Sequence, residues 1–190
     1  MGQEMMLTHC PREYLALVDV ESYPAFVAKE TDHLDMIAHL FAQMKALTAV
    51  AWGAPGQELR ILFHLTEDDR VVQRMTSAHC CTFASGHLRT GGQVCFTSHE
   101  RLFDCARHRS HDILRDERLP QNTRPHVLAV PPGVYSVHIF YHLPFPYGGG
   151  MEARPVPDPK VHFTVILRHY AFPAPRVAPV RLPGLMPWAA

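Results

Sequence analysis

Alternation of apolar and polar residues predicts a half-buried β-strand over residues 58–66. In this stretch four apolar side chains occupy every second position, at Leu59, Ile61, Phe63 and Leu65. Successive side chains of a strand point to opposite faces of a sheet, so these four share one face. The pattern therefore predicts one face in the core and one face close to water.

Two later stretches carry the same alternation and extend the predicted sheet. They are residues 133–142 and 161–170, and a shorter run over 126–130 is separated from the first by two prolines. Sheets with one buried face and one polar face are commonly antiparallel. We therefore expect residues 58–66, 133–142 and 161–170 to pair as antiparallel strands.

Apolar residues at three- and four-residue spacing predict the main helix over residues 32–47. Side chains at this spacing fall on one side of an α-helix, which is then buried against the core. Thr31 or Asp32 can cap the first turn, and Asp35 complements the positive end of the helix dipole. The stripe consists of Leu34, Ile37, Leu40, Phe41, Met44 and Leu47.

Glycine positions indicate where other parts of the chain turn. Gly91–Gly92 separates two extended stretches, 79–90 and 93–98, and this arrangement predicts a β-hairpin. Residues 14–20 fit either a short strand or a buried turn, and Trp52–Gly56 is expected to break the chain. Together the elements predict a mainly β, α+β fold, with an antiparallel sheet or β-sandwich and one main helix.

The last nineteen residues differ from the rest of the chain. Prolines recur there at four-residue spacing, which excludes a helix, so residues 172–190 are expected to form an extended proline-rich tail. Residues 1–171 then form one globular domain, with a long proline- and glycine-rich loop over 143–160. Because the tail also carries large apolar side chains, we expect it to pack on the domain or on a partner.

Charge and hydropathy exclude several classes of protein. Of 190 residues, 18 are lysine or arginine and 18 are aspartate or glutamate, so the formal net charge is zero. A general nucleic-acid binder is strongly basic, so nucleic acid is not expected as a partner. No stretch reaches the roughly 18 consecutive apolar residues of a membrane span, so no membrane partner is expected.

Cysteine usage and the start of the chain indicate a cytoplasmic protein. The five cysteines are odd in number and form no CxxC pair, which does not match a disulfide framework. No basic segment followed by an apolar one begins the chain, so no secretory signal is expected. The protein is also histidine-rich, with 14 imidazoles that titrate around pH 6.5 when unperturbed.

Cys105, His108 and Asp112 form the densest candidate for a metal site. On a helix they would share one face, and thiolate, imidazole and carboxylate groups all bind zinc. The spacing matches no closed structural site and supplies no fourth ligand. Cys105 also continues the apolar face of Leu102, which favours a buried thiol beside a basic loop. We therefore expect no cofactor, with zinc at this cluster as the alternative.

Arginine, histidine and tyrosine side chains supply two candidate partner-binding surfaces. An arginine-rich stretch over residues 107–125 suits an acidic partner, because guanidinium groups pair well with carboxylates, although its mixed charges also fit a solvated face. Histidines of the predicted strand 133–142 share one face, close to a tyrosine in the loop that follows. The predicted partner-binding residues are Arg107, Arg109, Arg115, Arg118, His138, His142 and Tyr147.

These observations favour a non-enzymatic, cytoplasmic module that binds another protein. The sequence contains no phosphate-binding glycine loop and no nucleophile elbow, whereas its loop, tail and arginines all offer contact surface. A bacterial immunity-type inhibitor of a toxin is one member of this class by analogy. The alternative is a metal-dependent hydrolase that uses a His/Cys site.

The apolar tail leads to the first testable prediction. Deleting residues 172–190 should lower the melting temperature by several degrees, or abolish a homodimer, because its large apolar side chains need to be covered. Differential scanning calorimetry and size-exclusion chromatography measure the two effects. A truncated protein that keeps both its melting temperature and its elution volume would show that the tail is a free linker.

Overall fold

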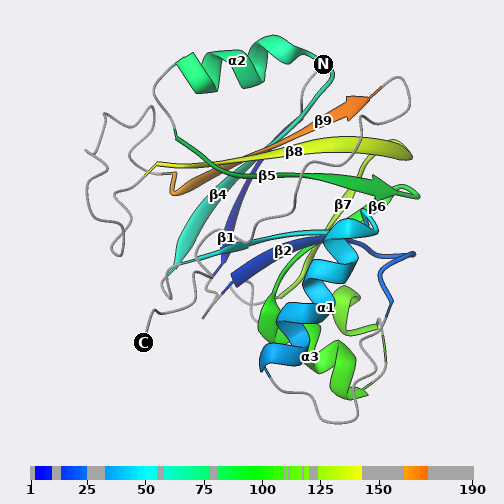
Figure 1. Ribbon diagram of the computed structural model, residues 1–190. Helices are drawn as coiled ribbons and strands as arrows, with labels where there is room; N and C mark the ends of the chain where they lie inside the picture. The colour runs from blue at the N-terminus through cyan, green and yellow to red at the C-terminus, as the bar shows by residue number, and fades with distance from the viewer. Residues whose placement is uncertain are drawn as a thin grey trace.

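The described part of the chain folds into nine strands and three α-helices, arranged in layers (Figure 1). The computed structural model describes residues 3–9, 14–24, 33–54, 58–77, 81–108, 110, 112–116, 118–119, 124–142 and 161–170. The expected tail, 172–190, and the expected loop, 143–160, lie outside these residues. The predicted mainly β, α+β fold is confirmed, and its strands form two stacked sheets.

The first sheet, called sheet A, contains the three strands that alternation predicted. In spatial order it consists of β1 (Gln3–His9), β4 (Leu59–Thr66), β9 (Phe163–Tyr170), β8 (Gly133–Tyr141) and β5 (Cys81–Thr90). β8 and β9 pair antiparallel as expected, but β4 and β9 pair parallel. The antiparallel prediction for this second pair was wrong. The chain between β4 and β9 builds all of β5, β6, β7 and β8, so no tight turn fixes their relative direction.

The second sheet, called sheet B, is antiparallel throughout. Its spatial order is β3 (Ala49–Gly53), β2 (Tyr14–Asp19), β6 (Gln93–Ser98) and β7 (His126–Ala129). The hairpin expected at Gly91–Gly92 is wrong, because β5 pairs in sheet A and β6 pairs in sheet B. The turn itself is present, and Gly92 adopts a φ of 134° that suits glycine. It carries the chain from one sheet to the other.

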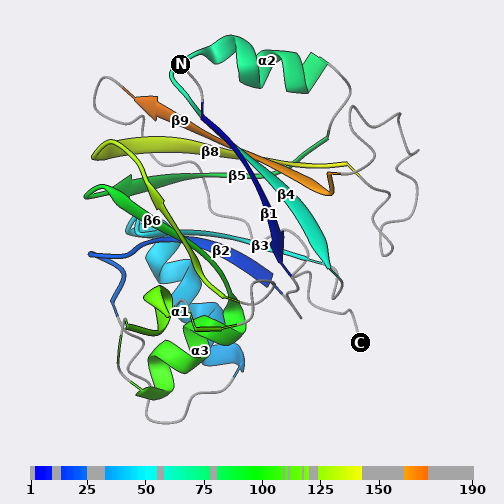
Figure 2. The same ribbon diagram turned by 180° about the vertical axis from the view of Figure 1, so that it is seen from behind.

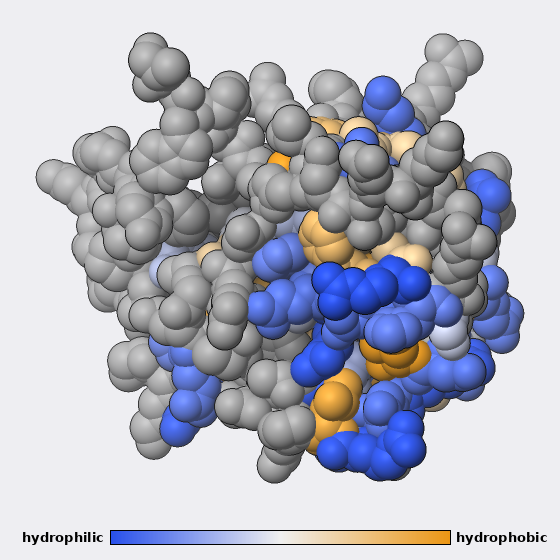
Figure 3. Space-filling model, turned by 90° about the horizontal axis from the view of Figure 1, so that it is seen from below, coloured by the Kyte–Doolittle hydropathy of each residue, from blue (hydrophilic) through white to orange (hydrophobic). Residues whose placement is uncertain are grey.

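Helices cover the outer faces of both sheets (Figures 1 and 2). α2 (Asp69–Ser77) lies over sheet A, where Val71, Val72 and Met75 pack against Phe140 and Ile166. α1 (His33–Lys45) and α3 (His99–His108) lie on sheet B. The surface of this helical layer is largely hydrophilic, with hydrophobic side chains between polar ones (Figure 3). None of the described helices combines the length and the hydropathy that crossing a membrane requires.

The core between the two sheets is built around aromatic side chains. Trp52 is fully buried, with its ring 6.1 Å from Phe96 and 6.3 Å from Phe163. The predicted apolar face of residues 58–66 points into this core, and Leu59, Ile61 and Phe63 are buried there. Pairs of packed aromatic rings add more to the stability of the fold than the burial of their surface alone. This layer therefore holds the two sheets together.

Sheet B is buried on both of its faces, which explains two differences from the sequence-based expectations. Leu15, Leu17 and Trp52 face sheet A, whereas Tyr14 and Ala16 face the helices. A strand buried on both faces is apolar without alternation. Of residues 14–20, Tyr14–Asp19 therefore form strand β2. Trp52, expected in a break, lies within strand β3.

The main helix is shorter than expected, and part of its predicted apolar stripe is buried. α1 ends at Lys45, and Leu47 follows with a φ of 63°, outside helical geometry. The predicted Leu40 and Met44 are buried, together with Met36, which was not predicted. The predicted Ile37 and Phe41 are half-buried at the margin. The stripe has four-residue spacing and lies against the helix-facing side of sheet B.

Asp19 links the end of β2 to the crossover between the sheets through hydrogen bonds. Its buried carboxylate accepts hydrogen bonds from the backbone N–H of Ser22 (2.8 Å) and of Gly91 (3.1 Å). Burial alone would raise the pKa of this carboxyl, but hydrogen bonds from Ser22, Thr90 and Gly91 outweigh it and lower the pKa. The folded protein therefore holds Asp19 ionised.

Replacing Asp19 tests this contact. Asp19→Asn should lower the free energy of unfolding at pH 7 by about 1.5–3 kcal/mol, because an amide cannot accept both backbone hydrogen bonds as a carboxylate does. The wild type should also lose stability as the pH falls below about 4, where the unfolded carboxyl binds a proton first, and the variant should lose less. Urea denaturation at pH 7 and pH 3.5 measures both effects. Glu58→Gln, at an exposed carboxylate, is the control, and an equal loss there would contradict the assignment.

Candidate functional site at the edge strand

β7 is the outermost strand of sheet B, and its local sequence explains why it is short. Pro125 precedes it, and Pro131 and Pro132 follow Val130, so prolines limit the strand at both ends. One side of β7 pairs with β6. In the part of the chain that the structure describes, no strand pairs with its other side.

Side chains of β7 alternate between the inter-sheet core and the outer surface. Leu128 is buried between the sheets, whereas Val127 points to the opposite side and is 41% exposed. Val127 is the one large hydrophobic residue with an exposed side chain among those described. A single exposed valine is ordinary, so its importance depends on the hollows beside it.

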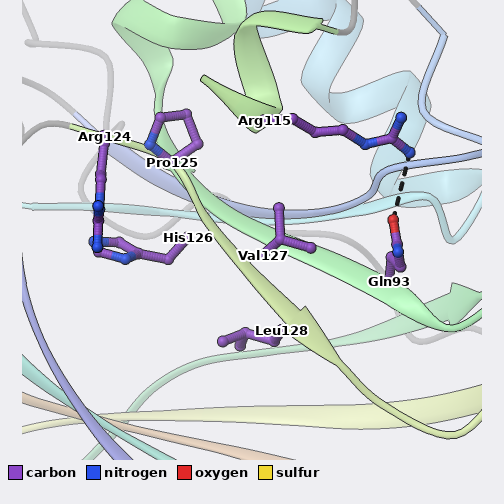
Figure 4. A pocket seen from close by; sticks show the side chains of 7 residues that line it. All are labelled: Gln93, Arg115, Arg124, Pro125, His126, Val127 and Leu128. Atoms are coloured by element: carbon purple, nitrogen blue, oxygen red, sulfur yellow. Dashed lines mark hydrogen bonds between the residues drawn. The ribbon is translucent and has the colours of Figure 1, made fainter. Parts of the chain in front are cut away.

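The first of these, called the arginine hollow, has a volume of about 340 Å³. A short 3₁₀ helix, Asp112–Arg115, buries Leu114 and leaves the next residue, Arg115, at the rim of the hollow. Arg115 and Arg124 lie toward opposite ends of β7, with Val127 between them (Figure 4). The hollow is lined by Gln93, Arg115, Arg124, Pro125, His126, Val127 and Leu128.

The two arginines of this hollow carry charge that no described carboxylate neutralises. Arg115 donates a 3.4 Å hydrogen bond to the side-chain oxygen of Gln93, which is uncharged. The adjacent carboxylate, Asp116, instead pairs with Arg118 at 3.0 Å, and hydrogen bonds from Arg118 lower the pKa of Asp116. Among the described residues neither Arg115 nor Arg124 forms an ion pair. The hollow is therefore suited to a negatively charged group.

The second, called the apolar hollow, lies on the inner side of the same strand. It has a volume of about 280 Å³ and opens between the edge of sheet B and the inner face of sheet A. Phe63 and Leu65 of β4 and Leu167 of β9 form its floor. Val127, Leu128, Ala129 and Val130 complete its lining. One edge strand thus separates a cationic hollow from an apolar one.

The structure brings together only part of the predicted arginine surface. Arg115 lines the arginine hollow, whereas Arg118 is engaged with Asp116. Arg107 is exposed in the last turn of α3, and Arg109 lies outside the described residues. Binding of a partner by these arginines stays a prediction.

The predicted histidine surface lies elsewhere, on the outer face of sheet A. His138 is half-buried beside Ser136, with its Nε2 atom 3.2 Å from the serine hydroxyl. His142 is buried, and its Nε2 atom lies 2.7 Å from the hydroxyl of Thr164. Tyr147 lies outside the described residues. The two histidines therefore do not contribute to the hollows beside β7.

Cys105, His108 and Asp112 do not form a common site in the structure. Cys105 lies on the buried side of α3. Burial, as the larger cause, and the nearby Asp104, as the second, raise the pKa of its thiol to about 12. His108 and Asp112 are exposed. Among the described residues, no group of three or more histidine, cysteine, aspartate or glutamate side chains is arranged to hold a metal ion. The hydrolase alternative stays a prediction.

Sequence reasoning missed most of the residues that line the two hollows. Gln93, His126 and Val127 were not singled out, because each belongs to a predicted strand and carries no chemical motif. The available signal was positional. A short strand between prolines, preceded by Arg124, is typical of a sheet edge.

Comparisons with known proteins support the fold, but they assign no family and no function. Neither a protein-family model nor a curated protein matches the chain. A solved structure named Crocagin biosynthetic gene J is similar, with 14% sequence identity and a TM-score of 0.50. The similarity covers 89% of this chain and 97% of that one. It shows that the two chains share a fold over nearly their full length.

The environment of His138 predicts acid sensitivity. Burial, followed by the nearby charges of Arg168 and His87, lowers the pKa of His138 below its usual 6.5. The unfolded chain therefore binds this proton more readily, and stability is lost as the pH falls from about 6.5 toward the folded pKa. From pH 7 to pH 5 the melting temperature of the wild type should fall by more than that of His138→Gln.

An exposed histidine provides the control for this experiment. His108→Gln, at the end of α3, should retain the acid sensitivity of the wild type. Thermal denaturation followed by circular dichroism at several pH values measures the difference. Equal pH dependence in the wild type and His138→Gln would contradict the assignment.

Proposed function

We propose that this protein is a non-enzymatic module that binds another protein through acidic side chains received in the arginine hollow. The observation that carries the proposal is the position of Arg115 and Arg124 at the two ends of one hollow, without ion pairs among the described residues. Arginine binds carboxylates through paired hydrogen bonds, so these two side chains favour an acidic partner.

The surroundings of the two arginines support a protein partner over a free anion. Val127 is exposed beside them, and the apolar hollow begins on the other side of the same strand. Protein interfaces combine an apolar centre with polar and charged groups at the rim, and arginine is enriched there. A small anion would use the charges and leave the apolar hollow empty.

Cytoplasmic location and an immunity-type inhibitor role belong to the same proposal. Cys95 and Cys105 are free and buried, which agrees with a protein that does not depend on disulfides. An inhibitor acts by covering its target, and a combined cationic and apolar surface suits an acidic target surface. The target itself stays unidentified.

Selection of peptides tests the proposal without knowledge of the natural partner. The probe is a phage-displayed library of random dodecapeptides, selected on the purified full-length protein, with selected peptides then synthesised and titrated. We expect enrichment of aspartate and glutamate. Arg115→Gln and Arg124→Gln should each weaken the binding about tenfold or more, equivalent to at least ~1.4 kcal/mol, because each removes a charge-assisted hydrogen bond.

A matched control separates this effect from a general change of net charge. Arg74→Gln removes the same charge from exposed α2, on the far side of sheet A. It should leave the dissociation constant unchanged within a factor of two or so. Selected peptides without acidic enrichment, or peptides that bind both hollow variants as tightly as the wild type, would refute the proposal.

A further inference from the structure

We infer that the partner segment binds as an extended strand added to the edge of β7 that pairs with no described strand, with acidic and apolar side chains in alternation. This inference rests on the proposed function and names the kind of segment that the site takes. Strand addition uses backbone hydrogen bonds for affinity and side-chain hollows for specificity. Both parts of that arrangement are present at β7.

The backbone of β7 offers hydrogen-bonding groups on its outer side. Leu128 lies opposite Val94 of β6, and the N–H of Val130 donates to the carbonyl oxygen of Gly92 at 3.0 Å. Even-numbered residues of this strand therefore direct their N–H and C=O groups toward β6. Because these directions alternate along an antiparallel strand, Val127 and Ala129 direct theirs away from the sheet.

The stacking of the sheets leaves room for one more strand on this side. Sheet A has five strands and sheet B has four. At the opposite edge β5 packs closely over β3, where a Cβ on Gly86 would lie 3.1 Å from Val50. At the β7 edge the apolar hollow instead lies against Leu65 of β4, which is half-buried, and reaches the buried Phe63 beneath it. A strand beside β7 would cover this part of sheet A.

The two hollows set the side-chain pattern of the added strand. Its side chains would point alternately to the inner and outer sides of sheet B. The inner set would meet Phe63, Leu65 and Leu167, and the outer set would lie on the side of Arg115. A segment that alternates apolar and acidic residues satisfies both sides, whereas a uniformly acidic segment would bury carboxylates on the apolar floor.

The positions of the arginines add a spacing requirement. Arg115 contacts Gln93, which pairs with Ala129 at one end of β7, and Arg124 precedes the other end. Four residues of extended chain span about 13 Å. An acidic side chain on the outer face of the added strand would therefore reach Arg115 at one end of β7, and one near Pro125 would reach Arg124, whose guanidinium lies beside His126 at the other end (Figure 4).

Charge argues against a second copy of this chain as the occupant. The β7 segment, His126–Ala129, contains no acidic residue. Pairing of β7 with β7 from another copy would bring no carboxylate to Arg115 or Arg124 from that strand. An acidic, alternating segment of a different protein provides what the hollow lacks.

Two capped octapeptides of identical composition test the inference on the full-length protein. One alternates glutamate and valine, and the other has four glutamates followed by four valines. We expect the alternating peptide to bind at least tenfold more tightly by isothermal titration calorimetry. Equal affinity for the two peptides would overturn strand addition while leaving an acidic docking site intact.

Proline substitutions test the backbone contacts directly. Val127→Pro and Ala129→Pro each remove an outward N–H but leave the hydrogen bonds to β6, and proline is tolerated at a sheet edge. Each should weaken binding of the alternating peptide at least tenfold, whereas Val127→Thr, which keeps its N–H, should weaken it by less than Val127→Pro. Unchanged binding by folded proline variants would overturn strand addition. If Arg115→Gln also had no effect, the proposed function would fail as well.

Amide hydrogen exchange gives a readout that needs no variant to fold. Adding the alternating peptide to the wild type should slow exchange at Val127 and Ala129 at least tenfold, with little change at Leu128, which already faces β6. No slowing at the first two amides would overturn the inference. Slow exchange at Val127 and Ala129 in the absence of peptide would also overturn the inference. If this protection rose with protein concentration, a second copy of the chain would occupy the edge of β7. If it did not depend on concentration, a segment of the same chain would occupy it.

Discussion

Burial of sheet B on both faces is the constraint on which the rest of the structure depends. One face packs against sheet A through Trp52 and Phe96, and the other packs under α1 and α3. Its two inner strands, β2 and β6, are therefore almost entirely buried, and their polar backbone groups are satisfied by neighbouring strands. Only at β7 does a side chain of this sheet emerge as an exposed large hydrophobic residue among those described, which is why the candidate site lies there.

Those parts of the fold that are buried on one side were predictable from the sequence. Residues 58–66 and 133–142 alternate because one face of sheet A meets the inter-sheet core, while parts of the other remain polar. The period-two pattern disappears where both faces are buried, so Tyr14–Asp19 and Ala49–Gly53 were ambiguous or missed. Strand partners were less predictable. Gly91–Gly92 has the residues of a hairpin turn, but only packing determines that β5 and β6 separate into different sheets.

The candidate site was predictable only as a tendency toward arginine-mediated binding. Arg115 was among the expected residues, because an arginine-rich stretch suggests an acidic partner. Its neighbours Gln93 and Val127 come from two strands that the register of sheet B brings side by side, and register is not visible in one sequence. Cys105 illustrates the opposite case: its spacing with His108 and Asp112 allowed a zinc site, but its position on the apolar face of Leu102 favoured a buried thiol, and the side chain is buried. Spacing alone does not distinguish these roles.

The place of β9 at the centre of sheet A has a consequence for how the protein folds as it is synthesised. β9 is the last strand in chain order that the structure describes, yet it joins the β1–β4 pair to the β8–β5 pair. The backbone hydrogen bond from the N–H of His162 to the carbonyl oxygen of Arg60 joins residues 102 positions apart, a separation typical of slow, non-local folding. Sheet A therefore cannot close until Phe163–Tyr170 has left the ribosome. Until then the edges of β4 and β8 are unpaired with β9, and they are the strands most exposed to misassociation in the nascent chain.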